Sequence, residues 1–327
     1  MSATKLDVQF PKLGIDFEDI KQAAKNISSY AHRTPVLTCE SLNRLTGQNL
    51  FFKCENLQKS GAFKYRGATN AISKLTPAQL KKGVVTHSSG NHAGALTLAA
   101  KNFGTTAHIV MPRTASKIKQ AAVKEYGGRI IECEPTLEAR LAVSEEVQKN
   151  TGATMIPPFN HRDVIAGQGT CALEFLRQVP NLDVIVVPVG GGGLIAGTCI
   201  AAKSISERIK IVGAEPTGAD DAYRSKQKGE LLQNETTDTI CDGLLTSLGQ
   251  LTWPFINEIV NRIVTVDDKE VIAAMKLFME RTKLLLEPNC AIALAAVTSP
   301  KMLELPHTKN VGIIITGGNV DLENLPW

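Results

Sequence analysis

The sequence predicts an α/β protein made of two open, parallel-type sheets that are covered by helices. Several segments are continuous apolar runs, which is typical of parallel strands that are buried on both faces. These runs alternate with helical patterns, several of which end at glycine. Three of the runs lead directly into glycine-rich turns, and parallel α/β sheets bind their ligands beyond the carboxyl ends of the strands.

The elements follow one another regularly from residue 83 onward. Before that point, Asp16 can cap a helix over residues 16–31, and Phe17, Ile20 and Ile27 fall on one face of it. Further strands are expected at residues 49–55, 83–87, 106–111, 129–133, 154–158, 183–189, 210–215 and 310–316. Further helices are expected at residues 91–104, 115–128, 136–150, 163–178, 193–206, 267–283 and 288–298.

The lengths of these elements predict two domains. Residues 83–157 hold several short strand–helix units, and longer elements lie on either side of them. We therefore expect a small domain of residues 78–157 inserted into a large domain of residues 1–77 and 158–327. A chain of 327 residues is long enough for such a division.

The composition excludes several functional classes. The net charge is +4, and the basic residues are scattered rather than gathered into a nucleic-acid-binding patch. The seven cysteines are widely spaced without a C-x-x-C pair, which argues against a zinc site or a disulfide framework. No signal core is visible, and no run of about 18 apolar residues occurs. We expect a cytoplasmic protein with no nucleic-acid or membrane partner.

The most informative glycine-rich turn follows the apolar run VIVVPV. It contains four successive glycines, namely Gly190, Gly191, Gly192 and Gly193. Without Cβ atoms, their backbone N–H groups can converge on an anion, and the following helix adds its positive end. This pattern favours a phosphate site over a plain strand-to-helix turn.

The glycines alone leave the phosphorylated ligand open. Gly191, Gly193 and Ala196 match a dinucleotide fingerprint, and Glu215 ends the next strand, where a ribose-binding acid would stand. An NAD-dependent oxidoreductase is therefore one alternative, and a non-catalytic phosphate binder is another. Neither of these alternatives gives a role to Lys64.

Lys64 lies in the segment SGAFKYRG, among small and apolar residues. Desolvation lowers the pKa of a lysine and makes its amine available as a nucleophile and base. A lysine of this kind together with a phosphate cradle suggests pyridoxal 5'-phosphate, which needs an amine for a Schiff base and an anchor for its phosphate. The alternative is a lysine whose stem packs while its charged end reaches water.

The motifs SGAFKYRGA, THSSGNHA, VVPVGGGGL, GAEPTGADD and GGNVDL resemble those of the fold type II pyridoxal-phosphate enzymes, in the same order. This family includes serine racemase and the serine and threonine dehydratases. The resemblance implies a tryptophan-synthase β-like fold with the cofactor in the cleft between two domains. It also implies an enzyme that interconverts L- and D-serine and dehydrates serine or threonine. A dehydratase of threonine or 3-hydroxyaspartate that does not racemise is the nearest rival.

The resemblance assigns roles to individual residues. Lys64 would bind pyridoxal phosphate covalently, with Phe63 beside the ring, Asn91 at the ring hydroxyl and Thr316 at the ring nitrogen. The four glycines would bind the phosphate. The segment that would hold the substrate carboxylate consists of Ser88, Ser89, Gly90, Asn91 and His92, and Arg140 matches an arginine near the substrate entrance.

The chemistry implied by the resemblance uses two opposite faces of the substrate. Lys64 would take the Cα proton from one face, and Ser89 would return a proton to the other face. As isolated serines, Ser88 and Ser89 could instead cap the following helix.

The resemblance also implies accessory ligands and a partner. Glu215, Ala219 and Asp221 would supply oxygen ligands for Mg²⁺, Ca²⁺ or Mn²⁺, although acids near a turn are also common as helix caps. Some racemases of the family bind ATP between the subunits of a homodimer. Four positions match that site, namely Lys59, Tyr126, Lys283 and Asn319, whereas Gly94 replaces a glutamine.

Overall fold

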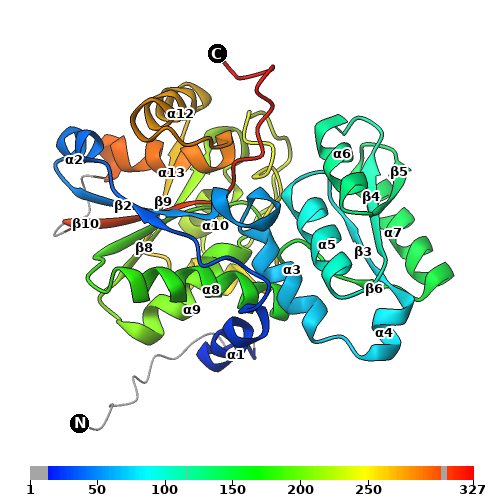
Figure 1. The fold of residues 1–327 in the computed structure, drawn as a ribbon. Coiled ribbons are helices and arrows are strands. Elements are labelled where there is room, and N and C mark those ends of the chain that lie inside the picture. Colours follow the sequence, from blue (N-terminus) through cyan, green and yellow to red (C-terminus); the bar gives the residue numbers. More distant parts are fainter. Residues whose placement is uncertain (1–13, 116, 303–307) are drawn as a thin grey trace, which may run out of the picture.

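The computed structural model describes residues 14–115, 117–302 and 308–327, and it contains two sheets (Figure 1). The larger sheet has the strand order β1-β2-β10-β7-β8-β9. Its strands are β1 (Val36–Leu37), β2 (Asn49–Cys54), β10 (Asn310–Ile315), β7 (Val184–Pro188), β8 (Lys210–Pro216) and β9 (Arg262–Val266). All neighbours are parallel except β1 and β2.

Helices cover both faces of this sheet. One face carries α1 (Phe17–Ile27), α8 (Arg162–Gln178) and α9 (Gly193–Ile205), and the other carries α2 (Glu40–Thr46), α12 (Asp268–Thr282) and α13 (Pro288–Thr298) (Figure 1). The side chains of β7 alternate between the two layers, because Ile185 and Val187 pack with α8 and α9 while Val184 and Val186 pack with α13. This burial on both faces explains the continuous apolar runs.

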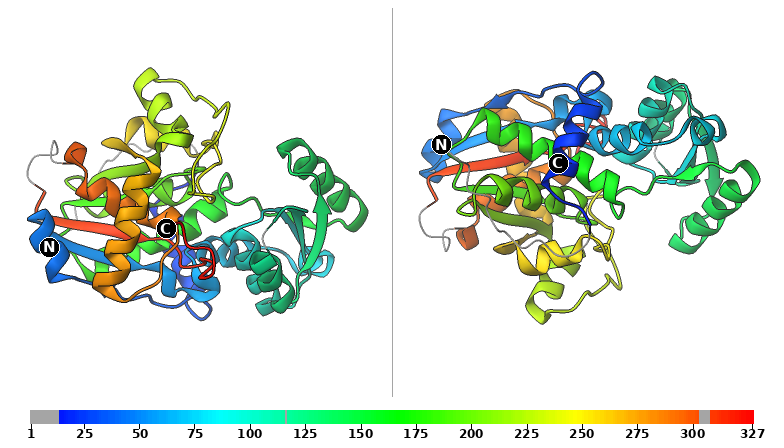
Figure 2. Two further views of the ribbon diagram at one scale, coloured as in Figure 1. Left: turned by 90° about the horizontal axis from the view of Figure 1, so that it is seen from above. Right: turned by 90° about the horizontal axis from the view of Figure 1, so that it is seen from below.

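The smaller sheet is entirely parallel and has the order β5-β4-β3-β6. Its strands are β5 (Arg129–Cys133), β4 (Ala107–Pro112), β3 (Val84–His87) and β6 (Thr154–Met155). The helices α5 (Asn91–Asn102) and α6 (Lys117–Glu125) pack on one face, and α7 (Leu137–Thr151) packs on the other. Figure 2 shows this sheet and its helices beside the larger sheet.

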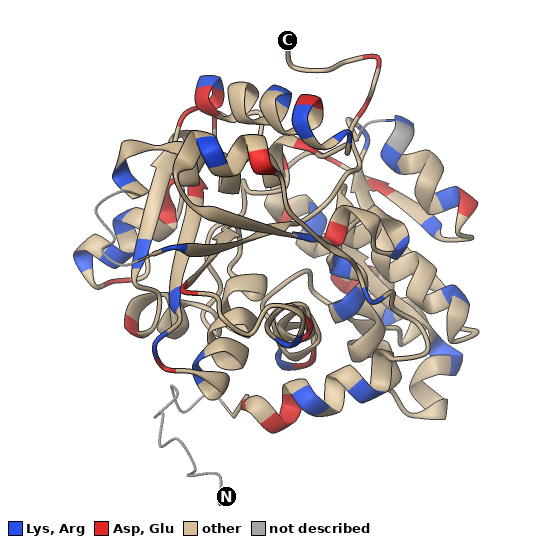
Figure 3. Ribbon diagram, turned by 60° about the vertical axis from the view of Figure 1, so that its left-hand side comes forward, with Lys and Arg blue, Asp and Glu red and all other residues tan. Residues whose placement is uncertain are grey.

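Helix α3 (Lys64–Ser73) joins the two sheet regions, since it contacts both α5 and α8. Short helices complete the fold, namely α4 (Pro77–Lys82), α10 (Asp221–Lys228) and α11 (Trp253–Glu258). Lysine, arginine and acidic residues are interspersed over the ribbon (Figure 3). No helix within the described ranges combines the length and apolar character that crossing a bilayer requires.

The fold class predicted from the sequence is confirmed. The first helix begins after Asp16, whose side chain forms a capping box with Asp19, but the helix ends at Ile27 rather than at residue 31. The strand expected at 154–158 covers only Thr154–Met155. The sequence analysis did not anticipate several elements: β1, β9, α2, α3, α4, α10 and α11. The proposed domain boundaries stay a prediction.

Candidate active site

Four neighbouring strands of the larger sheet, β2, β10, β7 and β8, end at the same edge because they are parallel. The chain leads from β2 through two short 3₁₀ turns to Lys64, and Thr316 directly follows β10. Gly190 to Gly193 follow β7, and Glu215 lies near the end of β8. The fold therefore gathers the sequence motifs at one edge.

Lys64 is the first residue of α3 and is held beside the end of β10. The Phe63 N–H donates to the carbonyl of Thr316 at 3.0 Å, and Ala62 forms a bridge with Gly317. The Lys64 Nζ donates to the carbonyl of Pro158 at 2.6 Å and lies 5.2 Å from the centre of the Phe63 ring. Burial lowers the pKa of Lys64 to about 8, because desolvation disfavours the ammonium form.

The glycine turn offers four backbone N–H groups that find no acceptor among the described residues. Gly192 and Gly193 are buried, and a buried N–H without a partner is unfavourable unless a ligand satisfies it. Gly192 has a φ of 85°, and a Cβ atom there would lie 2.7 Å from Thr252 Oγ1. Gly193 begins α9, whose helix dipole favours an anion. These features fit a phosphate group.

Thr316 lies buried between the lysine and the glycine turn. Its backbone is fixed by the hydrogen bond from Phe63, and its hydroxyl lies near the thiol of Cys290. A neutral hydroxyl at this position would not favour a protonated ring nitrogen on a bound pyridine.

The segment from Ser88 to Gly90 forms the turn between β3 and α5. The Ser88 N–H donates to the carbonyl of Val110 at 3.1 Å, and the Ser88 hydroxyl accepts from the Gly90 N–H at 3.3 Å. Gly90 is the N-cap residue of α5, and no side chain caps this helix. Within the described residues, the Ser89 hydroxyl has no hydrogen-bond partner. The alternative in which Ser88 and Ser89 cap the helix is therefore not the arrangement seen.

Asn91 connects this turn to the larger sheet region. Its Nδ2 donates to Glu287 Oε1 at 2.5 Å, and its Oδ1 accepts from Asn319 Nδ2 at 2.9 Å. Both ends of the amide are thus held by residues that lie near the carboxyl end of β10.

His92 differs from its neighbours in the segment, because its side chain is buried away from the turn. Its ring forms a hydrogen bond from Nε2 to the carbonyl of Ile156 at 2.9 Å, and Nδ1 has no partner among the described residues. Burial and the nearby Lys64 charge lower the pKa of His92 to about 3, so the ring is neutral. A contact between this side chain and a substrate carboxylate is not what the geometry favours.

Arg140 lies on α7 at the side of the turn. Burial and the charge of Arg140 lower the pKa of His87, the last residue of β3, which places the guanidinium near the strand end. The buried Arg140 Nε has no partner in the part of the chain that the structure describes. An unpaired donor here is consistent with an anionic ligand and does not support the alternative of a solvated surface charge.

Glu215 and Asp221 lie together beneath the amino-terminal end of α10. Glu215 accepts from the N–H groups of Ala222 and Tyr223 at 2.9 and 2.8 Å, and Asp221 accepts from the Leu248 N–H at 2.8 Å. Burial, followed by the charge of Asp221, raises the pKa of Glu215 well above its usual range. Burial raises the pKa of Asp221 to about 6.

This pair bears on two sequence predictions. Ala219 is buried in the 3₁₀ turn Thr217–Ala219, which lies between the two acids in the sequence. No group of three or more His, Cys, Asp or Glu side chains able to hold a metal occurs among the described residues. The expected ligand set of two carboxylates and one carbonyl stays a prediction. Glu215 is buried and faces the first turn of α10, a position that argues against contact with a ribose and so against the dinucleotide alternative.

The residues matched to an ATP site lie in different parts of the fold. Asn319 Nδ2 donates to the carbonyl of Ser60, next to Lys59. Tyr126 follows α6, and its ring would lie 3.9 Å from a Cβ on Gly94. Lys283 ends α12 with a φ of 64°. ATP binding stays a prediction.

Sequence reasoning missed Glu287. This residue is 3% exposed, and it interrupts the apolar run LLLEPNCAIALAA directly before Pro288. Burial, followed by repulsion from Asp242, raises the pKa of Glu287 to about 7. A lone acid in an apolar run is a signal that could have drawn attention to it, because buried carboxylates are rare without a partner.

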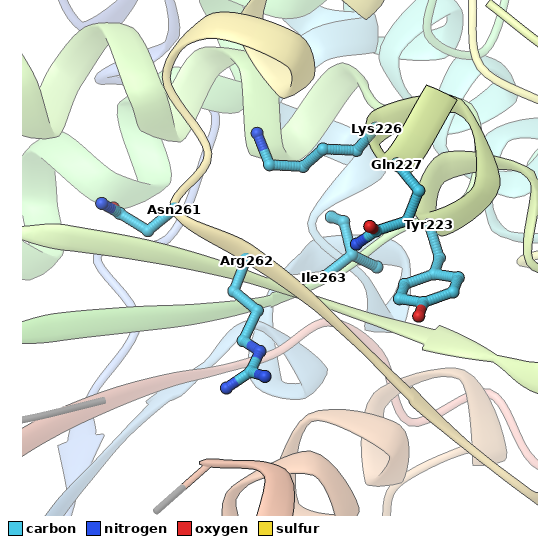
Figure 4. A pocket seen from close by; sticks show the side chains of 6 residues that line it. All are labelled: Tyr223, Lys226, Gln227, Asn261, Arg262 and Ile263. Atoms are coloured by element: carbon cyan, nitrogen blue, oxygen red, sulfur yellow. The ribbon is translucent and has the colours of Figure 1, made fainter. Parts of the chain in front are cut away.

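A pocket of about 360 Å³ lies elsewhere, between α10 and the start of β9 (Figure 4). Its lining contains none of the predicted site residues and consists of Tyr223, Lys226, Gln227, Asn261, Arg262 and Ile263. Lys226 Nζ donates to two backbone carbonyls, those of Ile256 and Asn257, so its charge serves the fold.

Comparisons with known proteins identify the family of this chain. A family model described as "Pyridoxal-phosphate dependent enzyme" matches residues 27–317. A serine racemase from Arabidopsis thaliana is 51% identical over 96% of this chain and 96% of its own length. A beta-hydroxyaspartate dehydratase from Paracoccus denitrificans is 47% identical over 95% of this chain and 98% of its own length. The structure of maize serine racemase superposes with a TM-score of 0.94 at 48% identity, covering 94% of this chain and 95% of that chain.

Proposed function

Because this chain belongs to the family of pyridoxal-phosphate dependent enzymes, we propose that it interconverts L- and D-serine and also dehydrates hydroxy amino acids. One observation carries the proposal. A partly buried lysine, whose pKa desolvation lowers to about 8, follows β2, and four N–H groups without acceptors among the described residues follow β7, at the same edge of one sheet with the end of β10 between them. A single molecule with an aldehyde and a phosphate would satisfy both.

The residues at the strand ends suit pyridoxal phosphate. Lys64 would bind it covalently, Gly190 to Gly193 would hold its phosphate, and the ring would lie beside Phe63. Asn91 has a second Nδ2–H that can donate to the ring hydroxyl, and Thr316 would face the ring nitrogen. When bound, the cofactor withdraws electrons from the substrate and makes its Cα–H bond more acidic.

Different residues of the protein would bind the substrate and transfer its protons. The N–H groups of the Ser88–His92 segment and Arg140 would hold the substrate carboxylate, while the side chain of His92 supports the fold. The neutral Lys64 amine would accept the Cα proton, and the Ser89 hydroxyl, free of other partners, would donate a proton to the opposite face. The same loss of the Cα proton, followed by departure of the β-hydroxyl, leads to dehydration.

We also infer a divalent cation at Glu215, Ala219 and Asp221. Two adjacent buried carboxylates repel each other, and a cation such as Mg²⁺ or Ca²⁺ would remove this repulsion. A homodimer and activation by ATP stay predictions from the resemblance, and a cytoplasmic location stays a prediction from the composition.

The test is incubation of the purified, cofactor-loaded protein with L-serine, with D-serine and pyruvate measured in the same sample. We expect both products. The dehydratase relative makes 3-hydroxyaspartate the second substrate to test. Pyruvate without D-serine, or preferential consumption of 3-hydroxyaspartate, would support a dehydratase in place of a racemase.

The variant Ser89→Ala tests the division of roles. Because only racemisation needs a proton donor on the second face, we expect D-serine formation to fall by about 100-fold or more, while pyruvate formation from L-serine persists. Lys64→Ala serves as the reference in which both activities vanish. An equal loss of both products in Ser89→Ala would contradict the role of Ser89.

A further inference from the structure

We propose that Glu287 is a positioning residue that fixes the orientation of the Asn91 amide and thereby the hydrogen bond that Asn91 makes to the cofactor. This inference rests on the proposed function and deepens it. Neither the motifs nor the relatives' names assign a role to Glu287.

The first step of the argument is the way Glu287 reaches Asn91. Glu287 is the N-cap residue of α13, and its N–H donates to the carbonyl of Gly317 at 3.2 Å. Its side chain makes no capping hydrogen bond. It passes Gly317 so closely that a Cβ on that glycine would lie 2.3 Å from Glu287 Oε1. The absence of a side chain at 317 therefore permits the 2.5 Å contact with Asn91.

The second step is the direction of the hydrogen bonds. An ionised carboxylate can only accept, so Glu287 requires the NH₂ group of Asn91 to face it. Asn319 Nδ2 donates to the other end of the amide, at Oδ1. These two contacts select one of the two amide orientations. One Nδ2–H then remains for a ligand.

The third step is that Glu287 links the two sheet regions. Asn91 begins α5, which covers the smaller sheet, whereas Glu287 and Asn319 belong to the region of the larger sheet. A second contact runs in parallel, from Lys119 Nζ on α6 to Asp242. The charges that face Glu287 are Asp242 and Lys119, one of each sign.

The test compares Glu287→Gln with the wild-type holoenzyme. Glutamine keeps the size but can donate as well as accept, so it no longer dictates the amide orientation. We expect kcat for L-serine to fall by about 10- to 100-fold, the usual range for losing a hydrogen bond to a charged group, while KM changes little. We also expect a shifted visible absorption band of the bound cofactor and weaker cofactor binding.

Stability separates positioning from a structural role. The raised pKa means that ionised Glu287 costs folding free energy above about pH 7, so the cofactor-free Glu287→Gln protein should unfold at the same temperature or higher at pH 8. Glu280→Gln, which removes an exposed carboxylate on α12, is the matched control and should leave kcat and the band unchanged. Asn319→Ala, which frees the other end of the amide, should shift the band in the same direction.

Two outcomes would overturn the inference. One is a Glu287→Gln enzyme with wild-type band, cofactor affinity and kcat. The other is a variant that loses stability and activity together while the band of the folded fraction is unaltered, since this would show a purely structural role. A wild-type protein that takes up no pyridoxal phosphate would instead defeat the proposed function itself.

Discussion

Two groups of buried charged side chains in the larger sheet region differ in whether positive and negative charges are paired. Beneath α3, Arg66 forms two hydrogen bonds of 2.7 Å to Glu55, and Lys53 lies 2.5 Å from Glu174, so two cations face two carboxylates. The Arg66 charge overcomes burial and holds the pKa of Glu55 below its usual range. The second group is the pair of acids beneath α10, whose pKa values are both raised.

The difference distinguishes charges that are paired within the protein from charges that are not. The cluster beneath α3 is complete, because each charge has its partner within the protein, and it fixes the helix that begins with Lys64. The pair beneath α10 accepts from N–H donors and one amide side chain, and the nearby cation, Arg224, forms its ion pair with Asp220 instead. Two buried acids without an ion-pair partner of their own are candidates for a ligand site, and this is the ground for the proposed cation.

The largest effect is expected from Arg66→Met. This change removes the cation that is hydrogen-bonded to buried Glu55 and leaves only the more weakly acting Lys53, and breaking a buried ion pair costs about 3–5 kcal/mol. Urea unfolding measures the loss. Adding Glu55→Gln to this variant should recover part of it, because the uncompensated charge is then removed. A cost equal to that of Arg44→Met, which breaks an exposed pair with Glu40, would contradict the comparison.

A smaller effect is expected from Mg²⁺ on the cofactor-free protein. The raised pKa of Asp221 means that its contribution to stability is complete below about pH 4 and is lost as the pH rises through about 6. Mg²⁺ should therefore raise the thermal unfolding midpoint more at pH 7.5 than at pH 5. At a hundred times its dissociation constant, the gain would be about 2.7 kcal/mol.

The variant Asp221→Asn is the matched test of that cation site. It removes one carboxylate while it keeps the size of the side chain, so Mg²⁺ should no longer raise the thermal unfolding midpoint. Without metal, the variant should unfold at a higher temperature than the wild type at pH 7.5. An undiminished Mg²⁺ response in this variant would place the cation elsewhere.

The same comparison explains what the sequence could and could not predict. The glycine turn and the apolar strands are local patterns, and the fold class follows from them. Helix α3 was missed because its buried polar residues have distant partners: Arg66 bonds to Glu55, and Asn70 donates to the carbonyl of Asp163. The strand order was not predicted either, since β10 lies between β2 and β7 only through contacts of long sequence separation.

The candidate site likewise contains residues with local sequence signals and residues that only tertiary contacts identify. Lys64 and the four glycines carry signals in their own neighbourhoods, so the sequence alone could propose them as site residues. Glu287 becomes visible only when the close approach to Gly317 and the contact with Asn91 are known. The unpartnered Nε of Arg140 likewise depends on how α7 packs beside β3.

The smallest effect is expected from Lys74→Met, which tests burial alone. Lys74 Nζ lies 2.6 Å from Asp163, and this pair joins α3 to α8, the same two helices that Arg66 and Glu174 join. The Lys74 and Asp163 side chains are 35% and 28% exposed, so water screens their attraction. We expect the free energy of unfolding to fall by no more than about 1 kcal/mol, with a further decrease in the effect at 1 M salt. If Lys74→Met were as costly as Arg66→Met, the link between the helices, and not the buried charge balance, would be what stabilises the start of α3.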